Sequence, residues 1–191
     1  MRYLVFDIET TRANPAPMRN INELEIALVG AYDSGTNAYS SYLKDELSRL
    51  WPLLERTDLL IGYNSDHFDI PLLNRYYPGD LTTIPSLDLL AEVYKALGRR
   101  LRLESLAQAT LGRGKKGDGL KAIEWWQAGE VEKVRDYCLE DVRLTKELFD
   151  YAREHKLLKY KDLQKVHELK IDTSTWDRAK NAPALTHTLS L

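Results

Sequence analysis

The chain has only one cysteine, Cys138, among its 191 residues. A single cysteine excludes an internal disulfide framework and any cysteine-based zinc site. The sequence also lacks an apolar run near the ~20 residues that a transmembrane helix requires, so we expect no association with a membrane. Met1 and Arg2 lead directly into an apolar segment and an acidic motif, which is not the layout of a signal peptide. We therefore expect a cytoplasmic protein.

A strong charge of one sign is missing as well, because the formal net charge is −2. The basic excess that often marks proteins that bind nucleic acids is therefore absent. This is weak evidence against such a partner, because a carboxylate-rich metal site lowers the total charge while a local basic strip still binds phosphates. The 43% hydrophobic and 29% charged residues are ordinary for a soluble protein with a real core. The length favours one domain with a small extension.

The hydrophobic pattern predicts an α/β sheet with mixed strand directions. Three opening segments predict an antiparallel meander of strands, at residues 2–7, 24–32 and 38–43. Short strands at 58–63 and 83–87 then alternate with helices expected at 44–56, 66–76, 88–97, 103–111, 120–127 and 131–153. After them, residues 157–160 and 166–171 are expected to pair as a hairpin, and the last dozen residues to fray.

An acidic pair ends the first predicted strand. Asp7 and Glu9 are two residues apart, so both side chains leave the same face of a strand. Residues 3–6 are wholly apolar, as expected of a central strand that is buried on both faces. Two carboxylates at the end of such a strand repel each other unless a cation lies between them. The alternative is a pair at a strand end that faces water.

A second acidic signal lies in the helix predicted over residues 131–153. Helical spacing places Asp141 in its core-facing stripe, together with Val134, Tyr137, Leu144 and Leu148. Burying a carboxylate is costly unless it is paired or bound to a metal. Tyr137 precedes Asp141 by four residues and so lies beside it. The alternatives are a buried salt bridge for Asp141 and core packing for Tyr137.

Asp69 is placed at the start of the helix predicted over residues 66–76. A first-turn aspartate there could serve only to complement the helix dipole, with Asp66 as the N-cap. We expect His67 to be a surface or supporting residue rather than a ligand.

The ordered segments FDIET, NSDHFD and YCLED resemble the three exonuclease motifs of the DEDD superfamily of 3′→5′ exonucleases. The resemblance covers about residues 1–152. The spacing of Tyr137 and Asp141 resembles that of the tyrosine-bearing branch, whereas the histidine branch would have His at the position of Asp136. Residues 103–145 also resemble uncharacterised bacterial exonuclease-like proteins of the same superfamily.

This resemblance implies a ribonuclease H-like α/β fold. The expected sheet is mixed and five-stranded, its first three strands form an antiparallel meander, and helices flank it. The exonuclease domain would span residues 1–153, and residues 154–191 would form a C-terminal extension.

The resemblance also implies a mechanism. Asp7, Glu9, Asp69 and Asp141 would hold two divalent cations, Mg²⁺ or Mn²⁺, which activate water and stabilise the departing 3′ oxygen. Tyr137 would position the water, because a phenol of pKa near 10 is a poor base at neutral pH. The implied activity is removal of nucleotides from the 3′ end of DNA or RNA. The side chains expected to support the terminal nucleotide are Thr10, Thr11, Asn64 and Phe68.

Basic and aromatic clusters supply further candidates. Arg113, Lys115 and Lys116 lie in a glycine-rich loop, residues 112–119, where backbone N–H groups can approach phosphate; the alternative is a solvated turn. A second basic cluster contains Arg99, Arg100 and Arg102. Trp125 and Trp126 could stack on bases, but we expect a core position for this pair.

Two other functions remain open at this point. One is an endonuclease on the same fold, and the other is a non-catalytic nucleic-acid-binding module. The expected partner is nucleic acid, with a single-stranded 3′ end, and residues 154–191 could guide substrate or dock a helicase or polymerase. The sequence assigns neither the choice between DNA and RNA nor the oligomeric state.

Overall fold

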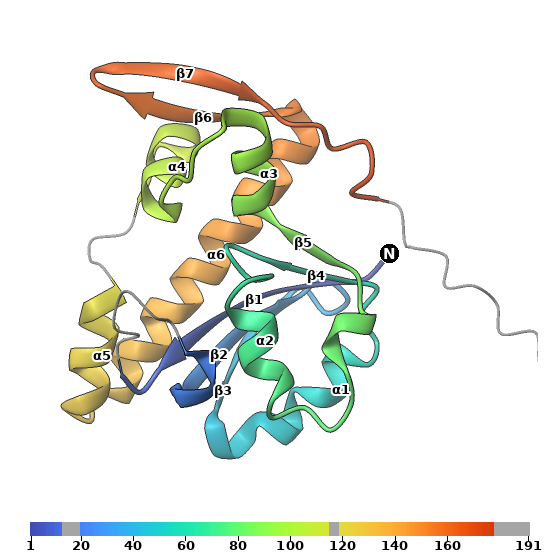
Figure 1. The fold of residues 1–191 in the computed structure, drawn as a ribbon, viewed down its shortest axis with the longest axis vertical. Helices are drawn as coiled ribbons and strands as arrows, with labels where there is room; N and C mark the ends of the chain where they lie inside the picture. Colours follow the sequence, from blue (N-terminus) through green and yellow to red (C-terminus); the bar gives the residue numbers. More distant parts are fainter. Residues whose placement is uncertain (13–19, 115–118, 178–191) are drawn as a thin grey trace, which may run out of the picture.

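A central five-stranded sheet organises the protein (Figure 1). The computed structural model describes residues 1–12, 20–114 and 119–177. The strands are β1 (Tyr3–Thr10), β2 (Ile26–Asp33), β3 (Ala38–Leu43), β4 (Leu59–Gly62) and β5 (Ser86–Asp88), in the spatial order β3-β2-β1-β4-β5. The first three strands pair antiparallel, and β4 and β5 join the sheet in parallel. The predicted meander and the mixed five-stranded sheet are confirmed.

Six α-helices accompany the sheet in the described part of the chain: α1 (Trp51–Leu54), α2 (Asp69–Asn74), α3 (Leu89–Leu97), α4 (Leu103–Leu111), α5 (Gly119–Gln127) and α6 (Val131–His155). Short 3₁₀ segments are η1 (Ile21–Glu23), η2 (Lys44–Arg49) and η3 (Leu81–Thr83). The helix expected over 44–56 is wrong as one element, since it is divided into η2 and α1. Pro52, in the first turn of α1, has no N–H to continue the preceding hydrogen-bond ladder.

Two further boundaries differ from expectation. The helix predicted from residue 66 begins only at Asp69, so Asp66 is not its N-cap; Phe68 holds that position. The strand predicted over 83–87 is shorter and later, because η3 occupies its first residue and β5 begins at Ser86.

Strand β1 is buried on both faces, as predicted. Val5 belongs to a core cluster that includes residues of α3, α4 and α6, whereas Leu4 and Phe6 belong to a second cluster with η2, α1 and α2. Helix α6 therefore covers one face of the sheet, and the short helices α1 and α2 cover the other (Figure 1). This layered arrangement brings the middle of α6 next to β1.

The C-terminal segment forms a hairpin of β6 (Leu157–Asp162) and β7 (Lys165–Lys170), next to α4 (Figure 1). Leu158 and Leu169 are buried in the same core cluster as α6. The division of the chain after residue 153 stays a prediction. Residues 178–191, which contain the segment expected to fray, lie outside the described residues.

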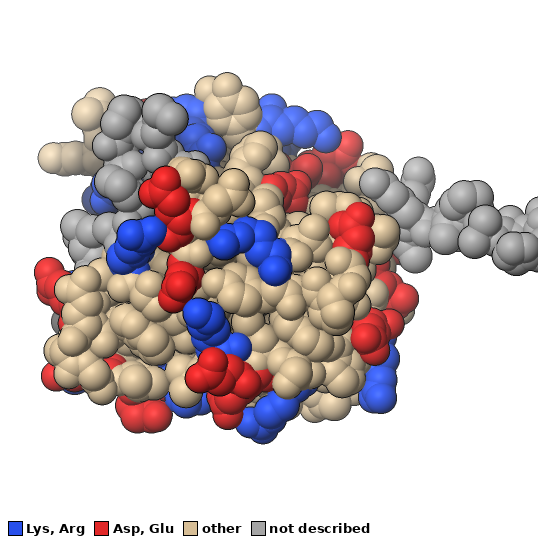
Figure 2. All heavy atoms as spheres, turned by 60° about the horizontal axis from the view of Figure 1, so that its bottom comes forward, with Lys and Arg blue, Asp and Glu red and all other residues tan. Residues whose placement is uncertain are grey.

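The charged groups are mixed on the surface. On the described part of the face in Figure 2, basic and acidic side chains alternate between uncharged areas, in keeping with the net charge of −2. None of the helices among the described residues combines the length and the apolar character needed to cross a membrane.

Candidate active site

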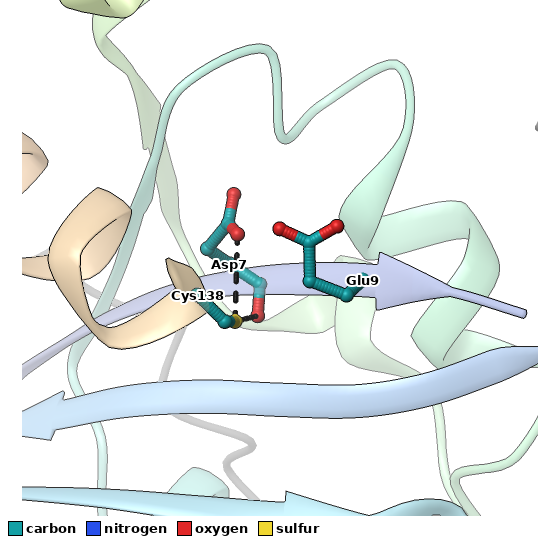
Figure 3. Close-up of side chains that lie close together, drawn as sticks. All are labelled: Asp7, Glu9 and Cys138. Atoms are coloured by element: carbon teal, nitrogen blue, oxygen red, sulfur yellow. Dashed lines mark hydrogen bonds between the residues drawn. The ribbon is translucent and has the colours of Figure 1, made fainter. Parts of the chain in front are cut away.

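The acidic pair projects from one side of β1. The carboxylates of Asp7 and Glu9 leave the strand in the same direction, and both side chains are partly buried (Figure 3). Gly30 of β2 lies opposite Asp7 in the antiparallel ladder. A Cβ atom on Gly30 would lie only 2.9 Å from Sγ of Cys138. Glycine at this position thus lets α6 approach the sheet beside the acidic pair.

Helix α6 adds the fully buried Cys138 to this centre. Its Sγ lies 3.4 Å from the backbone oxygen of Asp7 and 3.5 Å from Oδ2 of the same residue, so the thiol can donate to either (Figure 3). One ligand atom from each of Asp7, Glu9 and Cys138 lies within 4.8 Å of the other two. No such contact of Cys138 was expected from the sequence. Its position three residues before Asp141, on the same side of the helix, was the available signal.

Asp69 enters the centre from the opposite layer, as the first residue of α2. Its side chain is only 4% exposed. Burial raises the pKa of this carboxyl well above its usual range, and the nearby charge of Asp7 raises it further. Backbone N–H groups of Asp69 and Ile8 act in the opposite direction by donating to the carboxylate. The buried Asp69 and the partly buried Asp7 therefore lie close enough for the charge of one to act on the other.

The turn before α2 is fixed by a buried aspartate, Asp88. Its Oδ1 accepts hydrogen bonds from the N–H groups of Asn64, at 2.7 Å, and Leu90, at 2.9 Å, and thereby caps α3 as well. Gly62 permits this turn, because a Cβ atom there would lie 2.4 Å from Cβ of Ser65. Asp88 thus holds the turn that delivers Asp69. Its place as the first residue of the helix predicted over 88–97 was the sequence signal for a capping role.

Tyr137 and Asp141 reach the same centre from α6. Tyr137 is 7% exposed, and its ring meets that of Trp125 edge-on at 5.9 Å between centroids. Burial raises the pKa of Tyr137, and the charges of Asp141, Glu9, Glu104 and Asp7 raise it further, in that order. The phenol is therefore protonated at neutral pH.

Asp141 is partly buried, and its Oδ1 atom is shielded from solvent. The position of Asp141 beside Tyr137 agrees with the predicted helical stripe. The structure thus brings together five predicted residues: Asp7, Glu9, Asp69, Tyr137 and Asp141. Glu104 of α4 is a neighbour of Tyr137 that the sequence did not indicate.

The residues expected to support the terminal nucleotide lie at the end of β1, directly after it, and in the segment that precedes α2. The Thr10 hydroxyl donates to the backbone oxygen of Arg12 at 2.9 Å. The Thr11 N–H donates to the backbone oxygen of Glu25 at 3.0 Å. Phe68 packs partly buried against the core cluster of α2. Asn64 lies in the turn that Asp88 holds, and the substrate roles of all four stay predictions.

The basic residues singled out from the sequence have different partners in the structure. Arg113 forms an ion pair with Glu147 of α6. Arg99 pairs with Asp162 of the hairpin at 3.0 Å, whereas Arg100 donates to the side-chain oxygen of Asn64. Lys115 and Lys116 lie outside the described residues.

The tryptophan pair of α5 does not occupy the core. Trp125 and Trp126 are both partly exposed, so the expected core position is wrong for both. Helix α5 lies at the edge of the molecule beside the end of α6, where packing covers only part of each ring (Figure 1). His67 is exposed, as expected.

Comparisons with known proteins agree with this fold. A sequence model of the RNase H superfamily matches residues 4–153. The chain belongs to this superfamily. Among solved structures, the family B DNA polymerase of the hyperthermophilic archaeon Pyrobaculum calidifontis is similar, with a TM-score of 0.63 and 21% sequence identity. The similarity covers 80% of this chain and 24% of the polymerase chain. None of the curated proteins matches the sequence.

Proposed function

We propose that the protein is a metal-dependent 3′→5′ exonuclease of the tyrosine-bearing DEDD type, acting on DNA or RNA. The observation that carries the proposal is the clustering of carboxylates from β1, α2 and α6. The charge of Asp7 acts on Asp69, and the charges of Asp7, Glu9 and Asp141 all act on Tyr137. Membership of the RNase H superfamily supports a nuclease activity at such a centre.

The donor set fits two divalent cations such as Mg²⁺ or Mn²⁺. Hard cations prefer carboxylate oxygens, and Asp7, Glu9, Asp69 and Asp141 would hold them. Without a cation, burial and the neighbouring charge of Asp7 disfavour the ionised form of Asp69. When bound, the two ions supply an acidified water and stabilise the negative charge that develops on the departing oxygen.

The side chains of the site would position the attacking water and the substrate rather than act as a strong base. The Tyr137 hydroxyl, kept protonated by its surroundings, would hydrogen-bond to the attacking water and orient it toward the terminal phosphorus. The bond from phosphorus to the 3′ oxygen of the preceding nucleotide then breaks, and a nucleoside 5′-monophosphate leaves. Thr10, Thr11, Asn64 and Phe68 would support that terminal nucleotide, while Arg113, Lys115 and Lys116 would bind phosphates of the strand.

Single-stranded oligonucleotides labelled at the 5′ end test this proposal in Mg²⁺ and in Mn²⁺. We expect a ladder that shortens one nucleotide at a time, with mononucleotides as product. Matched DNA and RNA strands, single and double, define the preferred substrate. Internal fragments without mononucleotides would instead assign an endonuclease, and strand binding without cleavage would assign a non-catalytic module.

The hairpin of β6 and β7 is the proposed region for guiding substrate or for contact with a helicase or polymerase. It lies beside α4, away from the sheet (Figure 1), with Leu158 and Leu169 in the core cluster of α6, and Arg99 pairs with Asp162 on it. Comparing degradation of single strands and of tailed duplexes by the full chain, with and without Arg99→Ala, tests the guiding role.

A further inference from the structure

A cavity of about 340 Å³ lies beside the turn that leads to Asp69. The turn contributes Asn64 and His67, helix α3 contributes Leu90 and Tyr94, and Arg100 completes the wall from the segment after α3. Pockets for small ligands are typically about 300–1,000 Å³. The cavity is thus large enough for a ligand, and of the residues that line it the mechanism proposed above uses only Asn64, at its edge.

The positive charge of this cavity comes from Arg100. Asp88 also lines it, but this carboxylate already accepts from the N–H groups of Leu90 and Ala91 at the start of α3. Those amides are therefore engaged and do not provide an anion site. The exposed guanidinium of Arg100 has five N–H donors and one described bond, to the side-chain oxygen of Asn64. Because Arg100 lines the cavity and uses one donor for Asn64, it retains N–H donors that can bind the oxygens of a phosphate.

Leu90, Ala91 and Tyr94 supply the apolar part of the wall. Tyr94 is 55% exposed, so its ring is open to a ligand. A nucleobase gains affinity by stacking on such a ring, whatever its identity. The guanidinium of Arg100 and the ring of Tyr94 thus match the phosphate and the base of a nucleotide.

The cavity is also close to the acidic centre. Asn64 belongs to the turn that ends at Asp69, and the charge of Asp88 acts on Asp69 directly. A strand whose 3′ end occupies the acidic centre can therefore reach the cavity within its next nucleotides. The cavity is therefore placed to bind a nucleotide upstream of the bond that is cleaved.

We propose that this cavity binds one internal nucleotide of a single-stranded substrate, with its phosphate at Arg100 and its base against Tyr94. The inference rests on the proposed exonuclease function, because it supposes a 3′ end in the acidic centre. It adds a contact that lies away from the bond that is cleaved.

Binding without hydrolysis gives the first test. Fluorescence anisotropy of a 5′-labelled DNA decamer, and of its RNA counterpart, is measured in EDTA with the full chain. Arg100→Ala and Tyr94→Ala should each weaken binding about tenfold. Arg100→Ala should also reduce the dependence of log Kd on log salt concentration by about 0.7, the value for one phosphate contact with a single strand.

Matched variants separate this site from general effects. Arg56→Ala removes an exposed arginine that stands outside the described lining of the cavity and outside the basic residues singled out from the sequence, and its affinity should change less than twofold. Tyr94→Phe retains the ring and should bind like the wild type. Equal losses for Arg100→Ala and Arg56→Ala, or wild-type affinity for Tyr94→Ala, would overturn the assignment.

Hydrolysis of two substrates gives the second test. The decamer reaches both sites, whereas the p-nitrophenyl ester of thymidine 5′-monophosphate reaches only the acidic centre. Arg100→Ala and Tyr94→Ala should raise KM about tenfold for the decamer and leave the ester unchanged. Equal effects on both substrates would contradict a separate subsite. If the wild type hydrolyses neither substrate, the exonuclease proposal fails, while the anisotropy measurements still decide whether the cavity binds a strand.

Discussion

Two aspartates of this molecule are almost equally buried but have opposite surroundings. Asp33, at the end of β2, is 3% exposed, and Asp69, at the start of α2, is 4% exposed. Arg2 donates to both carboxylate oxygens of Asp33, at 2.6 and 2.9 Å. These bonds, with further ones from Gly35 and Thr36, lower the pKa of Asp33. Around Asp69 the acting charges are those of Asp7 and Asp88, and its pKa is raised.

The difference separates a carboxylate that the chain itself neutralises from the carboxylate proposed as a metal ligand. The charge of Asp33 is compensated by donors of the chain itself, so the folded protein favours the ionised form. The charge of Asp69 is opposed by burial and by like charges, so the folded protein needs either a proton or an external cation there. A buried acid beside another acid, rather than burial alone, is the feature that points to a metal site.

The largest expected effect is the loss of activity in variants of the acidic centre. Asp69→Asn and Asp141→Asn should each lower kcat for oligonucleotide hydrolysis at least about 10³-fold, because an ion that stabilises charge in the transition state is worth several kcal/mol. Asp33→Asn is the matched control, since it removes an equally buried charge far from the acidic centre, and its kcat should stay within twofold. Steady-state assays in Mn²⁺ measure all three variants. Near-wild-type turnover by Asp141→Asn is incompatible with a ligand role.

A smaller effect is expected from Tyr137→Phe, about 10²-fold in kcat, because the hydroxyl that orients the water is lost. Tyr3→Phe serves as control, since Tyr3 also has a pKa raised by burial, to about 12, but packs against Phe149 away from the acids. Because the pKa of Tyr137 lies above its usual value, the pH–rate profile should show no decline from its ionisation near neutral pH. An unchanged rate for Tyr137→Phe would show that Tyr137 serves in packing and does not orient the water.

Much of the fold could be predicted because its signals are local. The apolar segments of β1, β2 and β3 and the periodic stripe of α6 define their elements from neighbouring residues alone. Boundaries were less predictable where tertiary contacts decide them. Asp88, 22 residues after Asp66 in the chain, binds the backbone of the turn before α2 and delays the start of that helix to Asp69.

The acidic residues of the site were predictable as types in an ordered pattern, but their environment was not. The spacing of Cys138 from Asp141 indicates only a shared helix side, whereas the contact of its thiol with Asp7 depends on Gly30, more than 100 residues away. The partners of the basic residues are equally non-local: Arg113 pairs with Glu147, and Arg100 with Asn64. Sequence spacing predicts which side chains share one element, whereas pairing across elements depends on the packed layers.

A smaller effect, of opposite sign for the two aspartates, is expected on the free energy of unfolding at pH 7. Without metal, Asp33→Asn should lower the free energy of unfolding by about 1–2 kcal/mol, because charge-assisted hydrogen bonds from Arg2 are weakened. Asp69→Asn should raise it, because a buried like charge is removed while an oxygen that accepts backbone hydrogen bonds remains. Urea denaturation in EDTA measures both variants. Destabilisation by Asp69→Asn would mean that the chain itself compensates this charge.

The pH dependence of stability gives the finest distinction. A carboxyl whose pKa is lowered on folding makes stability rise with pH up to its ordinary value, here 3.8, so Asp33 acts on the acid side. A carboxyl whose pKa is raised on folding makes stability fall as pH increases above 3.8, so Asp69 acts toward neutral pH. A tenfold change in an acid dissociation constant on folding corresponds to about 1.4 kcal/mol of stability.

In the metal-free protein, Asp69→Asn should therefore flatten the decline above pH 3.8, and Asp33→Asn should flatten the rise below it. Adding Mn²⁺ should abolish the decline in the wild type, because a cation that binds only the folded, ionised centre stabilises it by mass action. The same addition should leave the acid-side rise unchanged, because Arg2 already neutralises Asp33. Denaturation curves across pH, with and without Mn²⁺, follow both limbs in one experiment. A decline that persists in Mn²⁺ would show that the ions do not occupy the centre containing Asp69.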